Sequence, residues 1–82
     1  MKINNKKELR AFREVLDQTT GSVWLETADG ERINLKSYLS KYVAIGALIE
    51  NRYADLELFC SLAEDEARFM KFFDEYPDTL GE

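Results

Sequence analysis

The sequence predicts an α+β domain, a two-layer open-faced sandwich with the order βαββαβα, in which three helices lie on one face of a four-stranded antiparallel sheet. Two patterns carry this prediction. Apolar residues recur at helical spacing near both ends of the chain, and Asp29-Gly30 separates two short segments in the manner of a β-hairpin. Because no repeat or linker interrupts the 82 residues, we expect a single domain over residues 1–82.

The first elements are a very short strand, Met1–Asn4, and a capped helix. Asn5, with Glu8 three residues later, is typical of a helix cap and its reciprocal partner. Residues 19–21, Thr-Thr-Gly, end this helix. Its core-facing residues recur every three or four positions: Leu9, Phe12, Val15 and Leu16.

A hairpin and a second helix follow. Residues 22–27 and 31–35 are its strands, and Asp29-Gly30 supplies the positive backbone angles of its tight turn. Asn34 and Ser37 are both suited to cap a helix that runs to about Glu50.

The last two elements are a strand over residues 55–60 and a helix that ends near Tyr76, before Pro77. Ser61 and Glu64 form the pattern of a second capping box. On a helical wheel the broad apolar face of this helix centres on three residues: Leu62, Met70 and Phe73.

Composition excludes several classes of function. The chain has 11 basic and 16 acidic residues, a net charge of −5, which argues against a nucleic-acid partner. No apolar run reaches membrane-spanning length and no signal-peptide core is present, so we expect no membrane partner and a cytoplasmic location. The single cysteine, Cys60, excludes an internal disulfide. The absence of histidine removes imidazole bases and the commonest zinc ligand.

Three stretches resemble the second half of HPr, the histidine-containing phosphocarrier of the bacterial sugar phosphotransferase system. They are DGERINLKS (29–37), DLELFCSLAEDEARF (55–69) and the terminal LGE (80–82). HPr proteins show a hairpin with Asn-Gly, then Asn-Leu-Lys-Ser opening a second helix, then a strand leading into an acidic helix. The likeness covers roughly Val23 to the C-terminus, with one insertion near residues 50–53.

The first half departs from HPr at the residues that carry its chemistry. Asn4 or Asn5 lies where the phosphorylated histidine should be, and Lys6 and Lys7 lie near the position of the family's arginine. Since phosphoryl relay in this family needs an imidazole, the resemblance implies a scaffold that cannot perform it. We therefore expect no enzyme activity, no catalytic residues, no cofactor and no metal.

The resemblance also implies a regulatory site at Ser37. The matching serine of many HPr proteins is phosphorylated by a dedicated kinase, and the product binds a regulator through the second helix. A phosphate there would lie at a helix N-terminus, with Lys36 and Lys41 close enough to contribute. The residues after Ser37 differ from those of HPr. The alternative is that Ser37 is a plain helix cap.

Several aromatic and apolar residues are candidate contacts for a protein partner or a second copy. The second helix is apolar nearly all round, as expected of a helix that meets a partner. The alternative is that the residues after Ile45 cover it. Trp24 is either a contact on the open face of the sheet or sheltered beside Arg32. The predicted contacts are Tyr38, Leu39, Lys41, Tyr42, Trp24 and Phe72, of which Phe72 is expected to be partly exposed.

The remaining candidates have ordinary explanations. The acidic residues of the last helix, Glu64, Asp65, Glu66, Asp74 and Glu75, are expected to form a solvated face. Cys60 is expected in the core rather than as a nucleophile. The sequence thus predicts a non-catalytic regulatory or adaptor domain that binds protein through its second helix. The alternative is a domain that senses a small molecule.

Overall fold

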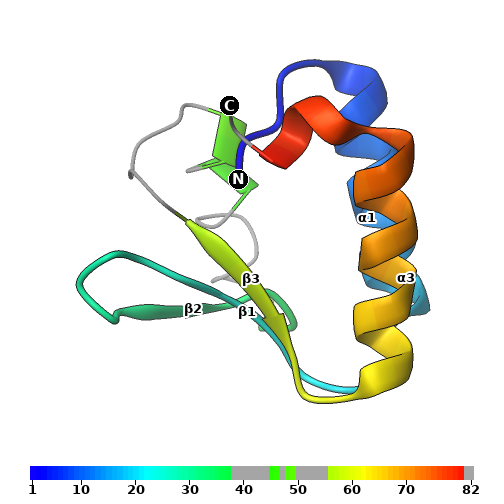
Figure 1. Ribbon diagram of the computed structural model, residues 1–82. Helices are drawn as coiled ribbons and strands as arrows, with labels where there is room; N and C mark the ends of the chain where they lie inside the picture. Colours follow the sequence, from blue (N-terminus) through cyan, green and yellow to red (C-terminus); the bar gives the residue numbers. More distant parts are fainter. Residues whose placement is uncertain (38–44, 47, 50–55, 81–82) are drawn as a thin grey trace.

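The computed structural model describes residues 1–37, 45–46, 48–49 and 56–80 and has an α+β fold. Figure 1 shows two helices side by side, with the sheet on one side of them. The expected second helix lies largely outside the described residues, although residues 45–46 and 48–49 are helical. The elements are α1 (Lys6–Gln18), β1 (Val23–Glu26), β2 (Arg32–Asn34), β3 (Glu57–Cys60), α3 (Ala63–Glu75) and a 3₁₀ helix η1 (Pro77–Leu80).

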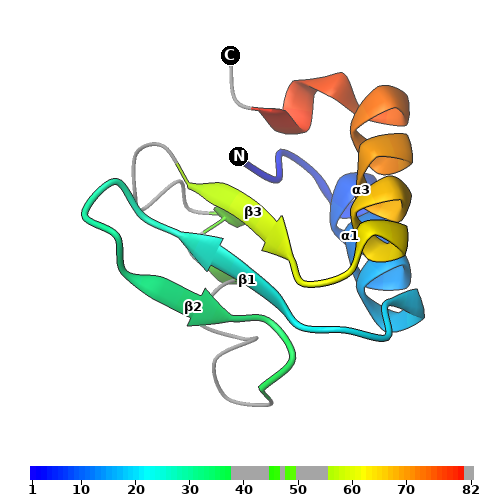
Figure 2. The ribbon, with the colours of Figure 1, turned by 60° about the horizontal axis from the view of Figure 1, so that its bottom comes forward.

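The described strands form one antiparallel sheet in the order β2-β1-β3, as Figure 2 shows. In β1, Trp24 lies opposite Asn34 of β2 and opposite Phe59 of β3. The neighbours of Trp24 in the chain, Val23 and Leu25, are fully buried. Because side chains alternate between the two faces of a strand, Trp24 lies on the face opposite the core.

The expectation of a first strand at Met1–Asn4 is wrong. The N–H of Lys2 donates to the carbonyl of Thr79 at 2.8 Å, and the N–H of Ile3 donates to the carbonyl of Leu48 at 3.1 Å. These partners belong to two separate segments, so no ladder forms. The described residues therefore contain three strands rather than four. They include two complete α-helices, α1 and α3, and the expected second helix lies largely outside them.

The cap of α1 is confirmed with one difference. The side chain of Asn5 accepts a hydrogen bond from the N–H of Glu8 at 2.9 Å. The Glu8 carboxylate accepts from the N–H of Asn4, one residue before the cap, at 2.8 Å. Two of the N–H groups at this end of the chain are thereby satisfied.

The hairpin is also confirmed. The N–H of Gly30 donates to the carbonyl of Thr27 at 3.0 Å, and the N–H of Thr27 donates to the carbonyl of Glu31 at 2.9 Å. Gly30 has φ of 85°, which a residue with a side chain adopts only with strain. The glycine therefore closes the turn between β1 and β2.

The predicted start and orientation of α3 need correction. Leu62 is the N-cap, and the Ser61 hydroxyl accepts from the N–H of Ser22 instead of capping the helix. Met70, predicted at the centre of the apolar face, is 61% exposed. The buried face instead centres on Phe69, which packs with its ring 5.6 Å from that of Phe12. The predicted end near Tyr76 is confirmed, since Tyr76 is the C-cap.

The core lies between the sheet and the two helices. Phe12 of α1 is fully buried and contacts the rings of Phe69 and Phe72 at centroid distances of 5.6 and 5.8 Å. Such tilted and edge-to-face pairs add to the burial of apolar area. The buried apolar residues are Ile3, Phe12, Leu16, Val23, Leu25, Leu35, Leu48, Leu56, Phe69 and Phe72.

Replacing Phe12 by alanine should destabilise the fold severely. Loss of a buried ring costs about 3–5 kcal/mol, against a total of about 4–12 kcal/mol expected for a chain of this length. Urea unfolding monitored by circular dichroism measures the change. The matched control is Phe73→Ala, because Phe73 is only partly buried and its loss should cost less. An equal cost for the two variants would contradict the assigned core.

Candidate functional site

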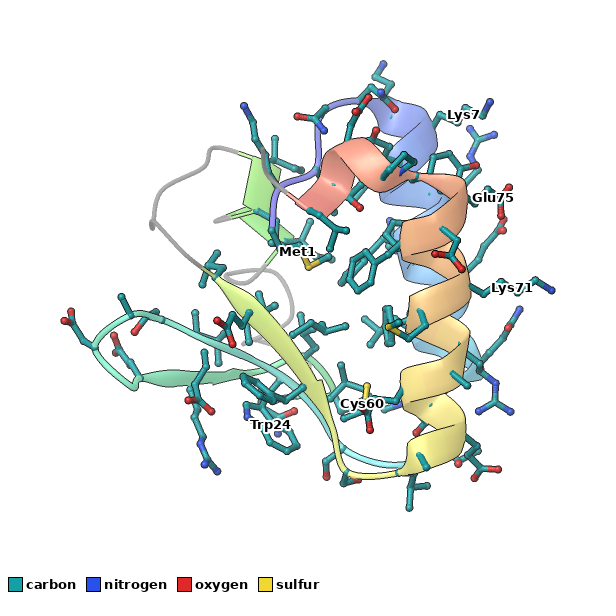
Figure 3. All side chains as sticks on the ribbon, in the orientation of Figure 1. Met1, Lys7, Trp24, Cys60, Lys71 and Glu75 are labelled. Atoms are coloured by element: carbon teal, nitrogen blue, oxygen red, sulfur yellow. The ribbon has the colours of Figure 1, made fainter. Side chains whose placement is uncertain are left out.

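The outer face of the sheet carries an aromatic pair. The rings of Trp24 and Phe59 are stacked, with centroids 5.9 Å apart and planes inclined by 18°. Figure 3 shows Trp24 directed away from the helices, whereas Cys60, which follows Phe59 in β3, points toward them. Both aromatic side chains are half-buried. They therefore present apolar area on the open side of the sheet.

Charged side chains surround this pair. The guanidinium carbon of Arg32 lies 5.4 Å from the centre of the Trp24 ring, within cation–π distance. The Glu26 carboxylate accepts from the indole N–H of Trp24 at 3.3 Å and pairs with Nε of Arg32 at 3.3 Å. Trp24 therefore lies beside Arg32 across the hairpin, while part of its ring stays accessible on the open face of the sheet. We call this group the outer sheet surface; its residues are Trp24, Glu26, Arg32, Glu57 and Phe59.

Glu57 leaves the outer sheet surface with unbalanced charge. It lies directly opposite Glu26 in the β1–β3 register. Like charges in directly opposite positions repel. Arg32 balances Glu26, but within the described ranges no cation pairs with Glu57, which is exposed. This edge of the sheet is therefore acidic.

Phe72 does not belong to the surface. The prediction that it is partly exposed is wrong, because only 3% of the residue is accessible and its ring packs on Phe12 and Tyr76. The rotation of α3 that exposes Met70 also turns Phe72 inward. Of the other predicted contacts, Trp24 lies in the described part of the chain. The remaining four lie outside it: Tyr38, Leu39, Lys41 and Tyr42.

Lys36 is engaged away from Ser37. Its ammonium group donates to the carbonyl and the hydroxyl oxygen of Thr19 at 2.9 and 2.8 Å. Thr19 is the C-cap of α1, where a cation is favourable. Asn34 does not cap a helix in the described part; its side chain accepts from the N–H of Lys36 at 2.8 Å. The expectation that Lys36 would contribute to a phosphate on Ser37 therefore does not fit this geometry. Ser37 itself is half-buried.

The start of α1 holds a hydrogen-bonded cluster. Asn4 donates from Nδ2 to Glu8 at 3.0 Å and to the carbonyl of Asp78 at 3.3 Å. Glu8 is buried, whereas Lys6 and Lys7 are exposed. A hollow of about 530 Å³ adjoins this cluster, lined by Lys2, Ile3, Asn4, Asn5, Lys6, Leu9 and Ile49.

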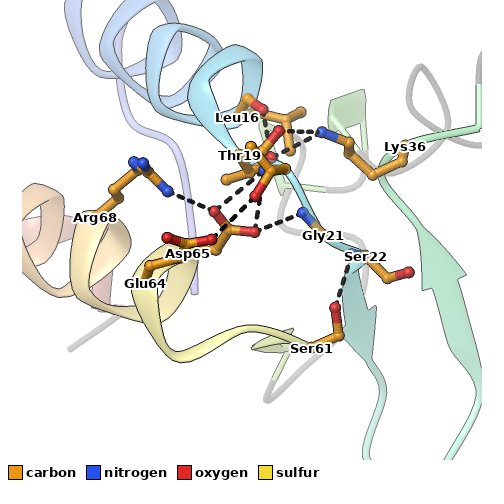
Figure 4. A network of polar contacts seen from close by, with 10 residues as sticks. Leu16, Thr19, Gly21, Ser22, Lys36, Ser61, Glu64, Asp65 and Arg68 are labelled. Carbon is orange, nitrogen blue, oxygen red and sulfur yellow. Dashed lines mark hydrogen bonds and ion pairs between the residues drawn. The ribbon is translucent and has the colours of Figure 1, made fainter.

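Asp65 contradicts the expectation of a solvated acidic face. It is fully buried at the start of α3. Its carboxylate accepts from the N–H of Thr20 at 3.2 Å and from the N–H of Gly21 at 2.8 Å, and it pairs with Arg68 at 2.7 Å (Figure 4). The carboxylate thereby joins α3 to the turn between α1 and β1. Helical spacing could not reveal this role, because the partners are backbone groups more than 40 residues away.

The surroundings of Asp65 favour its charged form. Burial acts to raise the pKa of the carboxyl, but the N–H groups of Gly21 and Thr20 and the charge of Arg68 outweigh burial and hold the pKa below its ordinary value of 3.8. A Cβ at Gly21 would lie 2.6 Å from Oγ of Ser61 and 2.7 Å from Cγ of Leu62, so a side chain there would force these two residues to shift. The turn and the start of α3 are therefore in close contact.

Cys60 has the environment of a core thiol. Burial, then the charges of Asp65 and Glu66, raise its pKa to about 11. The thiol is therefore protonated at neutral pH, and the thiolate needed for nucleophilic attack is scarce.

Comparisons with known proteins add no assignment. The chain matches no protein-family model, no curated protein and no solved structure. Across the described ranges, no group of three or more cysteine and acidic side chains is placed to hold a metal ion. No helix in the described part of the chain is both long and apolar enough to span a bilayer.

Replacing Asp65 by asparagine should destabilise the protein in a pH-dependent way. Because the folded pKa lies below the unfolded one, the stabilisation is complete above the unfolded value of 3.8 and is lost as pH falls through the folded pKa. The difference in unfolding free energy between wild type and Asp65→Asn should thus shrink in acid. Urea titrations over a pH series measure it. The control is Glu75→Gln, an exposed carboxylate on the same helix; the same pH dependence there would contradict the assignment.

Proposed function

We propose that this chain is a non-catalytic regulatory or adaptor domain, HPr-like in scaffold, that binds another protein or a second copy of itself. The observation that carries the proposal is the outer sheet surface, where the stacked rings of Trp24 and Phe59 lie on the face away from the helices. Tryptophan and arginine are the residues most enriched among those that dominate protein interfaces. Arg32 lies against Trp24 in this surface.

The second helix is the other part of the proposed contact. The sequence is the basis for proposing three contacts there, since an apolar helix with tyrosines suits an interface: Tyr38, Leu39 and Tyr42. Among the described residues of this segment, Leu48 is buried and Ile49 is exposed. The order of the described elements from the hairpin through β3 to α3 agrees with the order that the HPr resemblance implies. This agreement supports the scaffold part of the proposal.

Sensing of a small molecule is the second candidate. The hollow beside the start of α1 favours it, because Lys2 and Lys6 combine there with the apolar side chains of Leu9 and Ile49. Such a mixture of cations and apolar area suits a small anionic metabolite. This hollow shares no residue with the outer sheet surface, so the two candidates use different parts of the molecule.

Self-association should be measurable and should depend on the proposed contacts. Apparent mass measured by light scattering should rise with concentration, and Trp24→Ala or Tyr42→Asp should weaken the association about 30-fold, the effect of losing a contact of about 2 kcal/mol. Lys7→Ala is the control, since Lys7 is exposed on α1 and points away from the sheet (Figure 3). A constant mass together with a thermal shift on adding anionic metabolites would favour sensing instead.

Phosphorylation of Ser37 is the proposed form of control. Incubation with an HPr kinase and ATP should add one phosphate, detected by mass spectrometry, and Ser37→Ala should abolish it. An authentic HPr serves as the positive control. If that protein is modified and this chain is not, the phosphorylation proposal is lost and Ser37 remains a structural residue.

A further inference from the structure

The strand β3 lies at one edge of the described sheet, and half of its backbone groups point outward. Among the described strands, the order β2-β1-β3 leaves one side of β3 without a neighbour (Figure 2). The expected first strand, Met1–Asn4, pairs with other segments and does not cover this side. Within the described ranges, the N-terminal amine lies near this side and donates to the carbonyl of Leu56 at 2.9 Å, before β3 begins.

The register identifies which groups are free. Ser61 donates to the carbonyl of Ser22, so the pair Ser22 and Ser61 is hydrogen-bonded. Since hydrogen-bonded pairs alternate along antiparallel strands, Phe59 and Glu57 bond to β1, whereas Leu58 and Cys60 point their N–H and C=O groups to the open side. In the part of the chain that the structure describes, no hydrogen bond reaches these groups.

Apolar side chains flank this edge on the inner face. Leu58 and Cys60 are only half-buried although they face the core. On α3, the margin turned toward α1 carries Lys71 and Glu75, which line a hollow shared with that helix. Since successive residues of a helix are rotated by about 100°, Leu62, Met70 and Phe73 fall on the opposite margin. Leu62 and Met70 are exposed.

We infer that the open edge of β3 binds an extended segment of another protein, with apolar and basic residues in alternation, as an added antiparallel strand. Main-chain bonds to Leu58 and Cys60 supply the affinity in this mode of recognition, and alternate side chains supply the specificity. Residues opposite Leu58 and Cys60 would place apolar side chains on the inner face. The residue opposite Glu57 would lie on the outer face.

Charge favours a basic segment over a second copy. Glu57 lies opposite Glu26 with no cation of its own in the described ranges, so a lysine beside it relieves this repulsion. Glu66 adds further negative charge on the α3 margin, close enough to Cys60 to raise its pKa. Pairing two β3 edges would bring these acidic groups together in chains that each carry a net charge of −5. The inference rests on the proposed protein-binding function but uses the open edge of β3, which shares Glu57 with the outer sheet surface.

The test uses the full chain and a capped peptide, Lys-Val-Lys-Val-Lys-Val-Lys. In an antiparallel pair with β3 the valine N–H groups face Leu58 and Cys60, and the lysine N–H groups face away. N-methylation of the valines should therefore weaken binding at least about tenfold, the effect of one lost hydrogen bond or more. N-methylation of the lysines should leave binding unchanged. Equal affinities for the two methylated peptides would overturn the inference, as would tighter binding of Glu-Val-Glu-Val-Glu-Val-Glu.

A pair of protein variants tests the same edge from the other side. Cys60→Pro and Cys60→Ala both remove the thiol, but only proline removes the outward N–H. Peptide binding should be about tenfold weaker in Cys60→Pro than in Cys60→Ala. If circular dichroism shows that the proline variant is unfolded, the two methylated peptides with wild-type protein decide the question.

Hydrogen exchange gives a third reading and separates this inference from the proposed function. In the free protein the amides of Leu58 and Cys60 should exchange faster than that of Phe59, and the peptide should slow both. Self-association that Cys60→Pro abolishes would make a second copy the occupant and overturn the choice of a basic segment. If the peptide fails to bind while Trp24→Ala still weakens self-association, this inference falls and the proposed function stands.

Discussion

The arrangement of the two layers depends on one buried carboxylate. Asp65 lies in the first turn of α3 and binds the backbone of Thr20 and Gly21, so that the start of this helix is joined to the turn that leads from α1 into β1. Burying a carboxylate is costly unless its oxygens are bonded, and here two N–H groups and Arg68 satisfy them. This attachment also sets the rotation of α3, because Phe69 and Phe72 then face Phe12 while Met70 faces outward.

Local signals in the sequence predicted the elements whose determinants are themselves local. The Asn5 cap and the helical spacing of Leu9 to Leu16 gave α1, and Asp29-Gly30 gave the hairpin, because a cap and a turn depend on neighbouring residues. The first strand and the face of α3 were predicted wrongly. The first strand was wrong because the N–H groups of Lys2 and Ile3 bond to segments distant in sequence. The face of α3 was wrong because hydrophobicity alone favours Met70 over Asp65 for the core, whereas Asp65 is the buried residue.

The same division applies to the candidate site. The contact between Trp24 and Arg32 followed from the hairpin register, since the two strands are adjacent in the chain. The stacking of Phe59 on Trp24 could not be predicted, because it requires that β3 pair with β1 rather than with β2. The open edge of β3 depends on the same strand order. Topology, which local patterns do not encode, therefore decides which aromatic residues meet.

The position of Trp24 gives the protein an internal optical probe. It is the only tryptophan of the chain, so fluorescence excited at the long-wavelength end of the indole absorption band comes from one side chain. That indole donates to Glu26, stacks on Phe59 and lies beneath Arg32, three groups that come from all three described strands. Its emission wavelength and quenching therefore respond to the pairing of the sheet as well as to anything that covers its outer face, without an added label.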